Sequence, residues 1–216
     1  DRFFSPRTQT WYKNYTISMG YSIPQELLLS RAVDILPPLF LGKLMKTLQE
    51  YIPKVKICGI TSLEDALAAC DAGADAIGFN FAEEAKARGR YIDPDKALLI
   101  VDELPPFVMT VAVTVNEDAD TLLEYLTFVD RVQLHGEEPD DVCDAIGSEA
   151  IKVFRVTPDF DVRAMENYAA ASAYLLDAYV SDVRGGTGET FDWDIARKAV
   201  ALGKPLVLAG GLTPDN

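Results

Sequence analysis

From residue 55 onward, the chain alternates between short, β-prone apolar runs and longer stretches with helical spacing. The apolar runs cover residues 55–58, 75–81, 108–115, 131–134, 150–155, 173–177 and 205–209. They are apolar along most of their length, as strands are when both of their faces are covered. Strands that alternate with helices predict βαβ units and a parallel sheet.

The stretches between the runs place apolar residues three and four positions apart, which predicts amphipathic helices. In the clearest, residues 62–72, Leu63 and Leu67 lie on one face, and Thr61 or Ser62 can cap the first turn. Further helices are predicted at 93–102, 118–128, 139–146, 161–171 and 193–202.

The number of runs favours an α/β fold of the (β/α)8 barrel type, because strands recur at a spacing of roughly 20 to 30 residues. The seventh run lies just before Asn216, where the sequence stops. We therefore expect an incomplete barrel, with strands one to seven present and two open edges. Residues 45–216 are expected to form this domain, and residues 1–44 an N-terminal extension of unknown role with a helix near 24–36.

Composition excludes several classes of function. The net charge of −14 argues against nucleic-acid binding, which requires a basic stripe. The three cysteines are widely spaced and His135 is the only histidine, so neither a disulfide framework nor a metal site is predicted. Such cysteine usage fits a reducing cytoplasm. No apolar run reaches the roughly 18 residues of a membrane span, so no membrane partner is expected.

Two glycine-rich segments follow the last two strand runs, "RGGTGETFDW" at 184–193 and "LAGGLTP" at 208–214. Glycine lets backbone N–H groups approach an anion closely, and barrels of this type often bind phosphate near their last strands. Glycine also simply ends strands, and that alternative stays open. The candidate binding positions are Gly186, Thr187, Gly188, Gly210 and Gly211.

Cys58 and Asp177 close the first and sixth runs. A free cysteine is usually a small buried hydrophobe, and an aspartate at a barrel rim can simply cap or pair. Placed at the mouth of a barrel, however, a thiolate can act as a general base and a shielded carboxylic acid as a general acid. Such a pair moves one proton off a carbon and gives another to an oxygen, which is isomerase chemistry that needs no cofactor.

His135 and Arg90 are further candidates for contact with a substrate. His135 ends the fourth run in "VQLHG", and a lone histidine of this kind is assigned a substrate-lining role. Arg90 lies in the loop after the second run and can pair with a substrate carboxylate, although a loop arginine is often just solvated.

The motifs "KICGIT", "GADAIGFNF", "VQLHG", "LLDA", "GGTGETFDW" and "LAGGLTPDN" occur in one order along the chain. In this order and spacing, residues 54–216 resemble the phosphoribosylanthranilate isomerases of tryptophan biosynthesis. The resemblance implies a (β/α)8 barrel without metal or cofactor. It also implies an Amadori rearrangement of N-(5′-phosphoribosyl)anthranilate to 1-(2-carboxyphenylamino)-1-deoxyribulose 5-phosphate.

The resemblance also implies roles for individual residues. Cys58 matches the general base that removes the C2′ proton of the ribose, and Asp177 matches the general acid that protonates the ring oxygen. Arg90 matches the arginine at the anthranilate end, and residues 186–188 and 210–211 match phosphate-binding segments. The partner is then a small phosphorylated substrate, and the protein a cytoplasmic monomer or homodimer.

Two other interpretations remain. The chain could be a non-catalytic barrel fragment that binds a phosphorylated ligand or a partner protein. It could also be a related sugar-phosphate isomerase of histidine biosynthesis, but that enzyme typically uses two aspartates, and Cys58 speaks against it.

Overall fold

Eight strands close a barrel in the order β1 to β8 in the computed structural model. It describes residues 53–178 and 192–212, together with the backbone of residues 16–21. The strands are β1 (Thr16–Tyr21), β2 (Lys54–Cys58), β3 (Ala76–Asn80), β4 (Met109–Thr114), β5 (Arg131–Leu134), β6 (Ala150–Val156), β7 (Ala173–Ala178) and β8 (Leu206–Leu208). Strands β2 to β8 pair in parallel, each with the next, which confirms the seven predicted strands.

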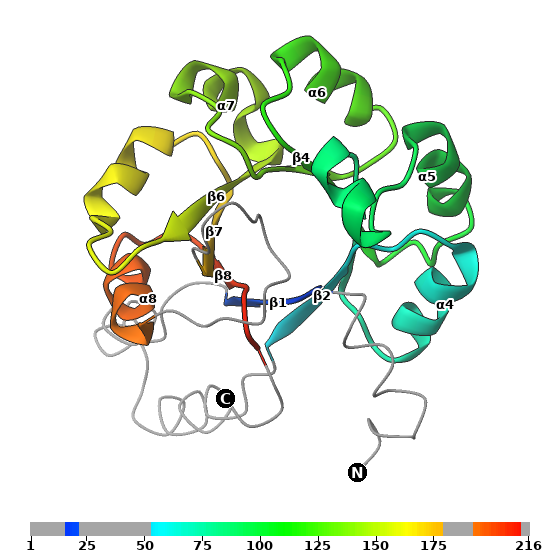
Figure 1. Cartoon of the computed structure of the whole chain (residues 1–216), viewed down its shortest axis with the longest axis horizontal. Helices are drawn as coiled ribbons and strands as arrows, with labels where there is room; N and C mark the ends of the chain where they lie inside the picture. The colour runs from blue at the N-terminus through cyan, green and yellow to red at the C-terminus, as the bar shows by residue number, and fades with distance from the viewer. Residues whose placement is uncertain (1–15, 22–52, 179–191, 213–216) are drawn as a thin grey trace, which may run out of the picture.

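Helices form an arc around the outside of these strands (Figure 1). They are α4 (Leu63–Asp71), α5 (Pro94–Val101), α6 (Ala119–Tyr125), α7 (Asp140–Ile146) and α8 (Trp193–Val200), with 3₁₀ helices η1 (Glu83–Arg88), η2 (Gly147–Glu149) and η3 (Val162–Tyr168). Five predicted α-helices are confirmed. Within the described part of the chain, no helix is long and apolar enough to cross a membrane.

The α-helix predicted at 161–171 is wrong in type, because the segment forms the 3₁₀ helix η3. Met165 of this segment is fully buried, and the ring of Tyr168 packs edge-on against Phe154 of β6 at 5.5 Å. The segment is short, so tertiary packing decides its winding more than helical periodicity does.

Helix starts follow the sequence signals. The Ser62 side chain caps α4 by accepting a hydrogen bond from the Asp65 backbone N–H at 3.2 Å. Asp93 caps α5 in the same way, and Pro94 occupies its first turn. Each cap stabilises its helix by about 1 kcal/mol, and together they fix where the chain leaves the barrel strands.

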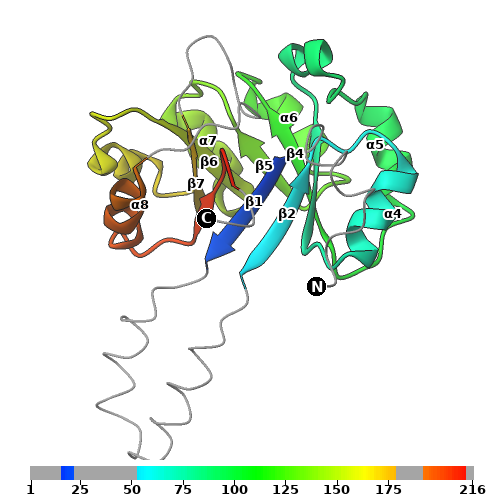
Figure 2. The ribbon, with the colours of Figure 1, turned by 60° about the horizontal axis from the view of Figure 1, so that its bottom comes forward.

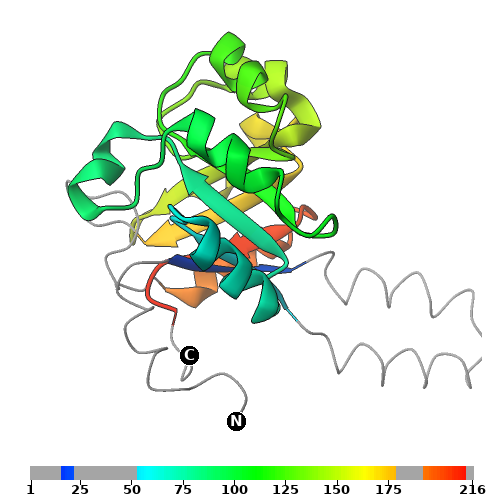
Figure 3. The ribbon, with the colours of Figure 1, turned by 90° about the vertical axis from the view of Figure 1, so that its right-hand side faces the viewer.

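The expectation of two open edges is wrong, because β1 fills the gap between β2 and β8. It pairs antiparallel with both neighbours, Thr16 opposite Cys58 and Met19 opposite Leu208 (Figures 2 and 3). An unpaired edge would leave a row of backbone N–H and C=O groups without partners, and a strand of the extension supplies them. The helix expected near 24–36 lies outside the described residues.

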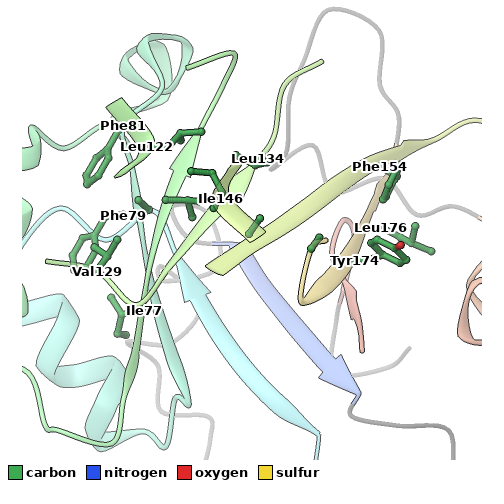
Figure 4. Close-up of a cluster of buried hydrophobic side chains, with 14 of the residues drawn as sticks. Ile77, Phe79, Phe81, Leu122, Val129, Leu134, Ile146, Phe154, Tyr174 and Leu176 are labelled. Carbon is green, nitrogen blue, oxygen red and sulfur yellow. The ribbon is translucent and has the colours of Figure 1, made fainter. Parts of the chain in front are cut away.

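Two hydrophobic clusters mark the two faces of the strands. The larger joins strand residues such as Phe79 and Leu176 to helix residues such as Leu122 (Figure 4). The smaller contains strand side chains of the opposite parity and fills the barrel interior. Its buried members are Ala76, Val111, Ile151, Val153, Leu175 and Ala209. The polar residues described next share this interior face.

Candidate active site

The carboxyl ends of parallel strands meet at one mouth of a barrel, and most of the predicted site residues lie there. Cys58 is the last residue of β2, and Asp177 is the last but one of β7. His135 follows β5 directly, and Gly210 and Gly211 follow β8 closely. The other candidate phosphate-binding positions, Gly186, Thr187 and Gly188, lie outside the described residues.

Cys58 faces the barrel interior. Ile57 packs against the strand–helix core, so its neighbours on β2 point the other way. The Cys58 side chain is buried against Gly78 of β3. A Cβ atom at Gly78 would lie 2.8 Å from Cys58 Sγ, so a glycine is needed there to leave room for the thiol.

Asp177 also points inward, where it meets His135. His135 Nε2 lies 3.3 Å from Asp177 Oδ2, although β6 separates their strands, so the contact crosses the interior of the barrel. Gln133 Nε2 lies 3.1 Å from His135 Nδ1. The Gln133 amide can donate to Nδ1, and Nε2 is the ring nitrogen on the side of Asp177.

The turn after β8 lies against the same carboxyl group. Gly210 and Gly211 have φ values of 85° and 60°, in the left-handed region that favours glycine. A Cβ atom at Gly210 would come within 2.9 Å of both Asp177 Oδ1 and the Ala178 backbone nitrogen. This close approach places one of the predicted phosphate segments beside the predicted acid.

Arg90 ties the loop after β3 to the end of β2. Its Nη2 donates a hydrogen bond to the Cys58 carbonyl oxygen at 3.1 Å. Gly59, with φ of 90°, makes room for the guanidinium, because a Cβ atom there would lie 2.7 Å from Arg90 Nε. The structure therefore brings Arg90 to the mouth of the barrel, next to Cys58.

Comparison with known proteins fits this arrangement. Residues 55–216 match the family described as N-(5′-phosphoribosyl)anthranilate (PRA) isomerase. The chain belongs to this family. Curated relatives named N-(5′-phosphoribosyl)anthranilate isomerase include that of Geobacter sulfurreducens, 51% identical over 76% of this chain and 79% of the relative. That of Moorella thermoacetica is 44% identical over 76% of this chain and 72% of the relative.

Solved structures of the family agree. The phosphoribosyl anthranilate isomerase of Thermotoga maritima is 42% identical, with a TM-score of 0.66 over 74% of this chain and 78% of that one. Another structure holds the family's enzyme in complex with reduced 1-(o-carboxyphenylamino)-1-deoxyribulose 5-phosphate. It is 40% identical, with a TM-score of 0.63 over 74% of this chain and 77% of that one.

Three interior polar residues were not singled out from the sequence. Lys56 precedes Cys58 by two positions on β2, and Gln133 precedes His135 by two positions at the end of β5. Arg155 of β6 lies opposite Asp177 of β7 in the strand register. Side chains two apart on a strand share a face, so strand periodicity alone could have found the first two.

A second polar cluster lies on the helix-facing side of the barrel. Lys152 Nζ lies 2.6 Å from Glu138 Oε2 and donates to the Gly136 carbonyl oxygen at 3.0 Å. Glu138 Oε1 accepts from the backbone N–H of Asn116 at 2.9 Å. Burial alone would raise the pKa of Glu138, but the charge and hydrogen bond of Lys152 outweigh it and hold that pKa below its usual value.

No metal site is evident in the described residues, where no group of three or more His, Cys, Asp and Glu side chains is arranged to hold an ion.

Proposed function

We propose that this protein converts N-(5′-phosphoribosyl)anthranilate to 1-(2-carboxyphenylamino)-1-deoxyribulose 5-phosphate in tryptophan biosynthesis. The observation that carries the proposal is the family match over residues 55–216, together with a thiol and a carboxyl group on the interior face of one barrel mouth. The relative solved with a reduced form of this product supports the substrate class.

The reaction begins at Asp177, which gives a proton to the ring oxygen of the ribose. The bond between C1′ and that oxygen breaks as the nitrogen lone pair forms a C=N bond, so the sugar opens to an iminium ion. His135 is the positioning residue for this step, because its Nε2 lies 3.3 Å from the carboxyl group of Asp177.

Cys58 then acts on the open chain. Its thiolate takes the proton from C2′, and the electron pair of that C–H bond forms the C1′=C2′ double bond while the nitrogen regains its lone pair. The enolamine gains a proton at C1′ and loses the one on the C2′ oxygen, which gives the aminoketone. Protons move and bonds shift, but nothing is oxidised overall.

The proposed binding groups come from three segments. The Arg90 guanidinium, which bonds to the Cys58 carbonyl oxygen, is proposed to pair with the anthranilate carboxylate. Backbone N–H groups at Gly210 and Gly211, with those of residues 186–188, are proposed to hold the phosphate. The active form is a monomer or a homodimer, and a Thermotoga maritima relative is described as dimeric.

The test is turnover by the purified chain, followed as the loss of anthranilate-type fluorescence when the assay is coupled to an enzyme that consumes the product. Replacing the base with Cys58→Ala should lower kcat by about 10²- to 10⁴-fold. Cys70→Ala, which removes a half-buried thiol from the outer helix α4, is the matched control and should leave kcat unchanged. Normal turnover by Cys58→Ala would exclude the assigned base. Product binding without turnover by the unmutated chain would favour a ligand-binding role.

A further inference from the structure

Lys56 is buried inside the barrel, and no described residue forms a hydrogen bond with its ammonium group. Its side chain lies on β2 and the residue is only 7% exposed. A buried, unpaired ammonium group is costly, because it gives up its hydration and gains no opposite charge. Buried ionisable groups of this kind cluster at functional sites.

The ammonium group lies next to the thiol. Lys56 and Cys58 are two apart on one strand, so both face inward. A Cβ atom placed on Gly78 would lie 2.9 Å from Lys56 Nζ and 2.8 Å from Cys58 Sγ. The two atoms therefore converge on one point over β3, within the roughly 6 Å across which opposite charges stabilise each other.

We propose that Lys56 is a positioning residue whose ammonium group stabilises the thiolate of Cys58. The inference rests on the proposed function for the role of Cys58 as base. When the thiol gives up its proton to solvent, sulfur and nitrogen become an ion pair, and the buried lysine gains the counter-charge that it lacks while the thiol is neutral.

The sequences of the two strands that pair with β2 contain no Asp, Glu, Lys, Arg or His that could act on the thiolate in place of Lys56. The β3 sequence AIGFN has no ionisable side chain, and the β1 sequence TISMGY contains no Asp, Glu, Lys, Arg or His. Arg90 also lies near Cys58, where its Nη2 donates to the Cys58 carbonyl oxygen at 3.1 Å. Among the described residues of β2 and β3, Lys56 is therefore the charged side chain that faces the thiol.

The experiment measures alkylation of Cys58 by iodoacetamide across a range of pH in the full chain, with peptide mass spectrometry separating it from Cys70 and Cys143. Lys56→Met should move the half-maximal point to higher pH. It should lower the rate at pH 7 about threefold, because the loss of thiolate is partly offset by its greater nucleophilicity. Lys56→Arg keeps the charge and should retain the original profile.

Lys54→Met is the matched control. Lys54 lies on the same strand, but its ammonium is exposed and pairs with Asp75 at 2.7 Å. This variant should alkylate as the unmutated protein does. Lys56→Gln supplies a second neutral variant if Lys56→Met does not fold, and it should show the same shift.

Alkylation needs no substrate, so the two proposals can fail separately. A shifted profile in a protein without turnover would overturn the isomerase assignment and leave the ion pair standing. An unchanged profile in a folded Lys56→Met or Lys56→Gln variant would overturn the role of Lys56, whatever the turnover. In an active protein, Lys56→Met should also lower kcat at pH 7 about tenfold.

Discussion

Lys56 and Lys152 are both buried on barrel strands, but their surroundings are opposite. Lys152 faces the helices, where Glu138 lies 2.6 Å away and the Gly136 carbonyl accepts a second bond. Lys56 faces the interior beside Cys58, and its ammonium has no hydrogen-bond partner among the described residues. The ammonium group of Lys152 is therefore paired in the folded protein, whereas that of Lys56 has no hydrogen bond to a described residue.

On the proposed function, this contrast separates residues that stabilise the fold from residues that act in the reaction. On the side of the strands that faces the helices, here called the outer layer, the buried charges of Lys152 and Glu138 are paired. Removing one partner leaves the other charge buried and unpaired, which is costly. On the side of the strands that faces the barrel interior, here called the inner layer, Lys56, Cys58, His135 and Asp177 are buried polar residues. Natural proteins accept such local costs at functional sites.

The largest expected effect on activity comes from the inner layer. Asp177→Asn removes the proposed acid while keeping its size, so kcat should fall by about 10³- to 10⁴-fold. The free energy of unfolding should change little, because the ion-pair partner of Asp177 in the described part of the chain is a histidine. Steady-state kinetics and urea unfolding measure the two quantities. If Asp177→Asn lowered the free energy of unfolding substantially as well as kcat, the distinction between the two layers would be contradicted.

The largest expected effect on stability comes from the outer layer. Glu138→Ala leaves Lys152 buried without its partner, so the free energy of unfolding should fall by about 3–5 kcal/mol. Urea unfolding monitored by circular dichroism measures the loss. The folded fraction should keep most of its kcat, since Glu138 touches the loops of the mouth only through the backbone N–H groups of Asn116 and Gly136. A stability unchanged by this substitution would show that the pair does not hold the fold.

The same pair predicts a pH dependence. The folded-state pKa of Glu138 lies below its ordinary value of 4.5, so its contribution is fully present above pH 4.5 and is lost as pH falls through the lower folded value. Below pH 4.5, the free energy of unfolding of Glu138→Gln should therefore fall less steeply with falling pH than that of the unmutated protein. If the free energy of unfolding falls equally steeply below pH 4.5 in both proteins, other carboxylates cause the acid sensitivity.

The smallest effect concerns Tyr174, a buried residue of β7 on the outer layer. Burial raises the pKa of its hydroxyl to about 12 from 10.0. The folded state then holds a proton that the unfolded chain has lost, so stability declines as pH rises from 10 toward 12. Tyr174→Phe should lose about 1 kcal/mol or less at pH 7, and its decline above pH 10 should be shallower in a urea-unfolding series. An equally steep decline would locate the alkaline sensitivity elsewhere.

The parallel strands could be predicted closely because each is buried on both faces and reads as an apolar run. Strand β1 could not, because "TISMGY" carries only a short, weak strand signal and pairs where β2 and β8 would otherwise be open edges. The segment of η3 was predicted as an α-helix but forms a 3₁₀ helix, because core contacts of Met165 and Tyr168 decide its conformation.

The candidate site was predictable in part. Residues that end strands, such as Cys58 and Asp177, could be placed at one mouth by topology alone. The contact between His135 and Asp177 could not, because it crosses the barrel between strands that are not neighbours. Lys56 was overlooked because a lysine in a strand suggests a solvated face, although its spacing from Cys58 put both on one side.

The most direct test of this account measures kcat and the free energy of unfolding together for Lys56→Met and Glu138→Ala. The account predicts opposite patterns. Lys56→Met loses turnover while its free energy of unfolding stays the same or rises, because an unpaired buried charge is removed. Glu138→Ala loses stability while its folded fraction turns over normally. If both variants lose turnover and stability to the same degree, the division of the barrel into a structural outer layer and a chemical inner layer is wrong.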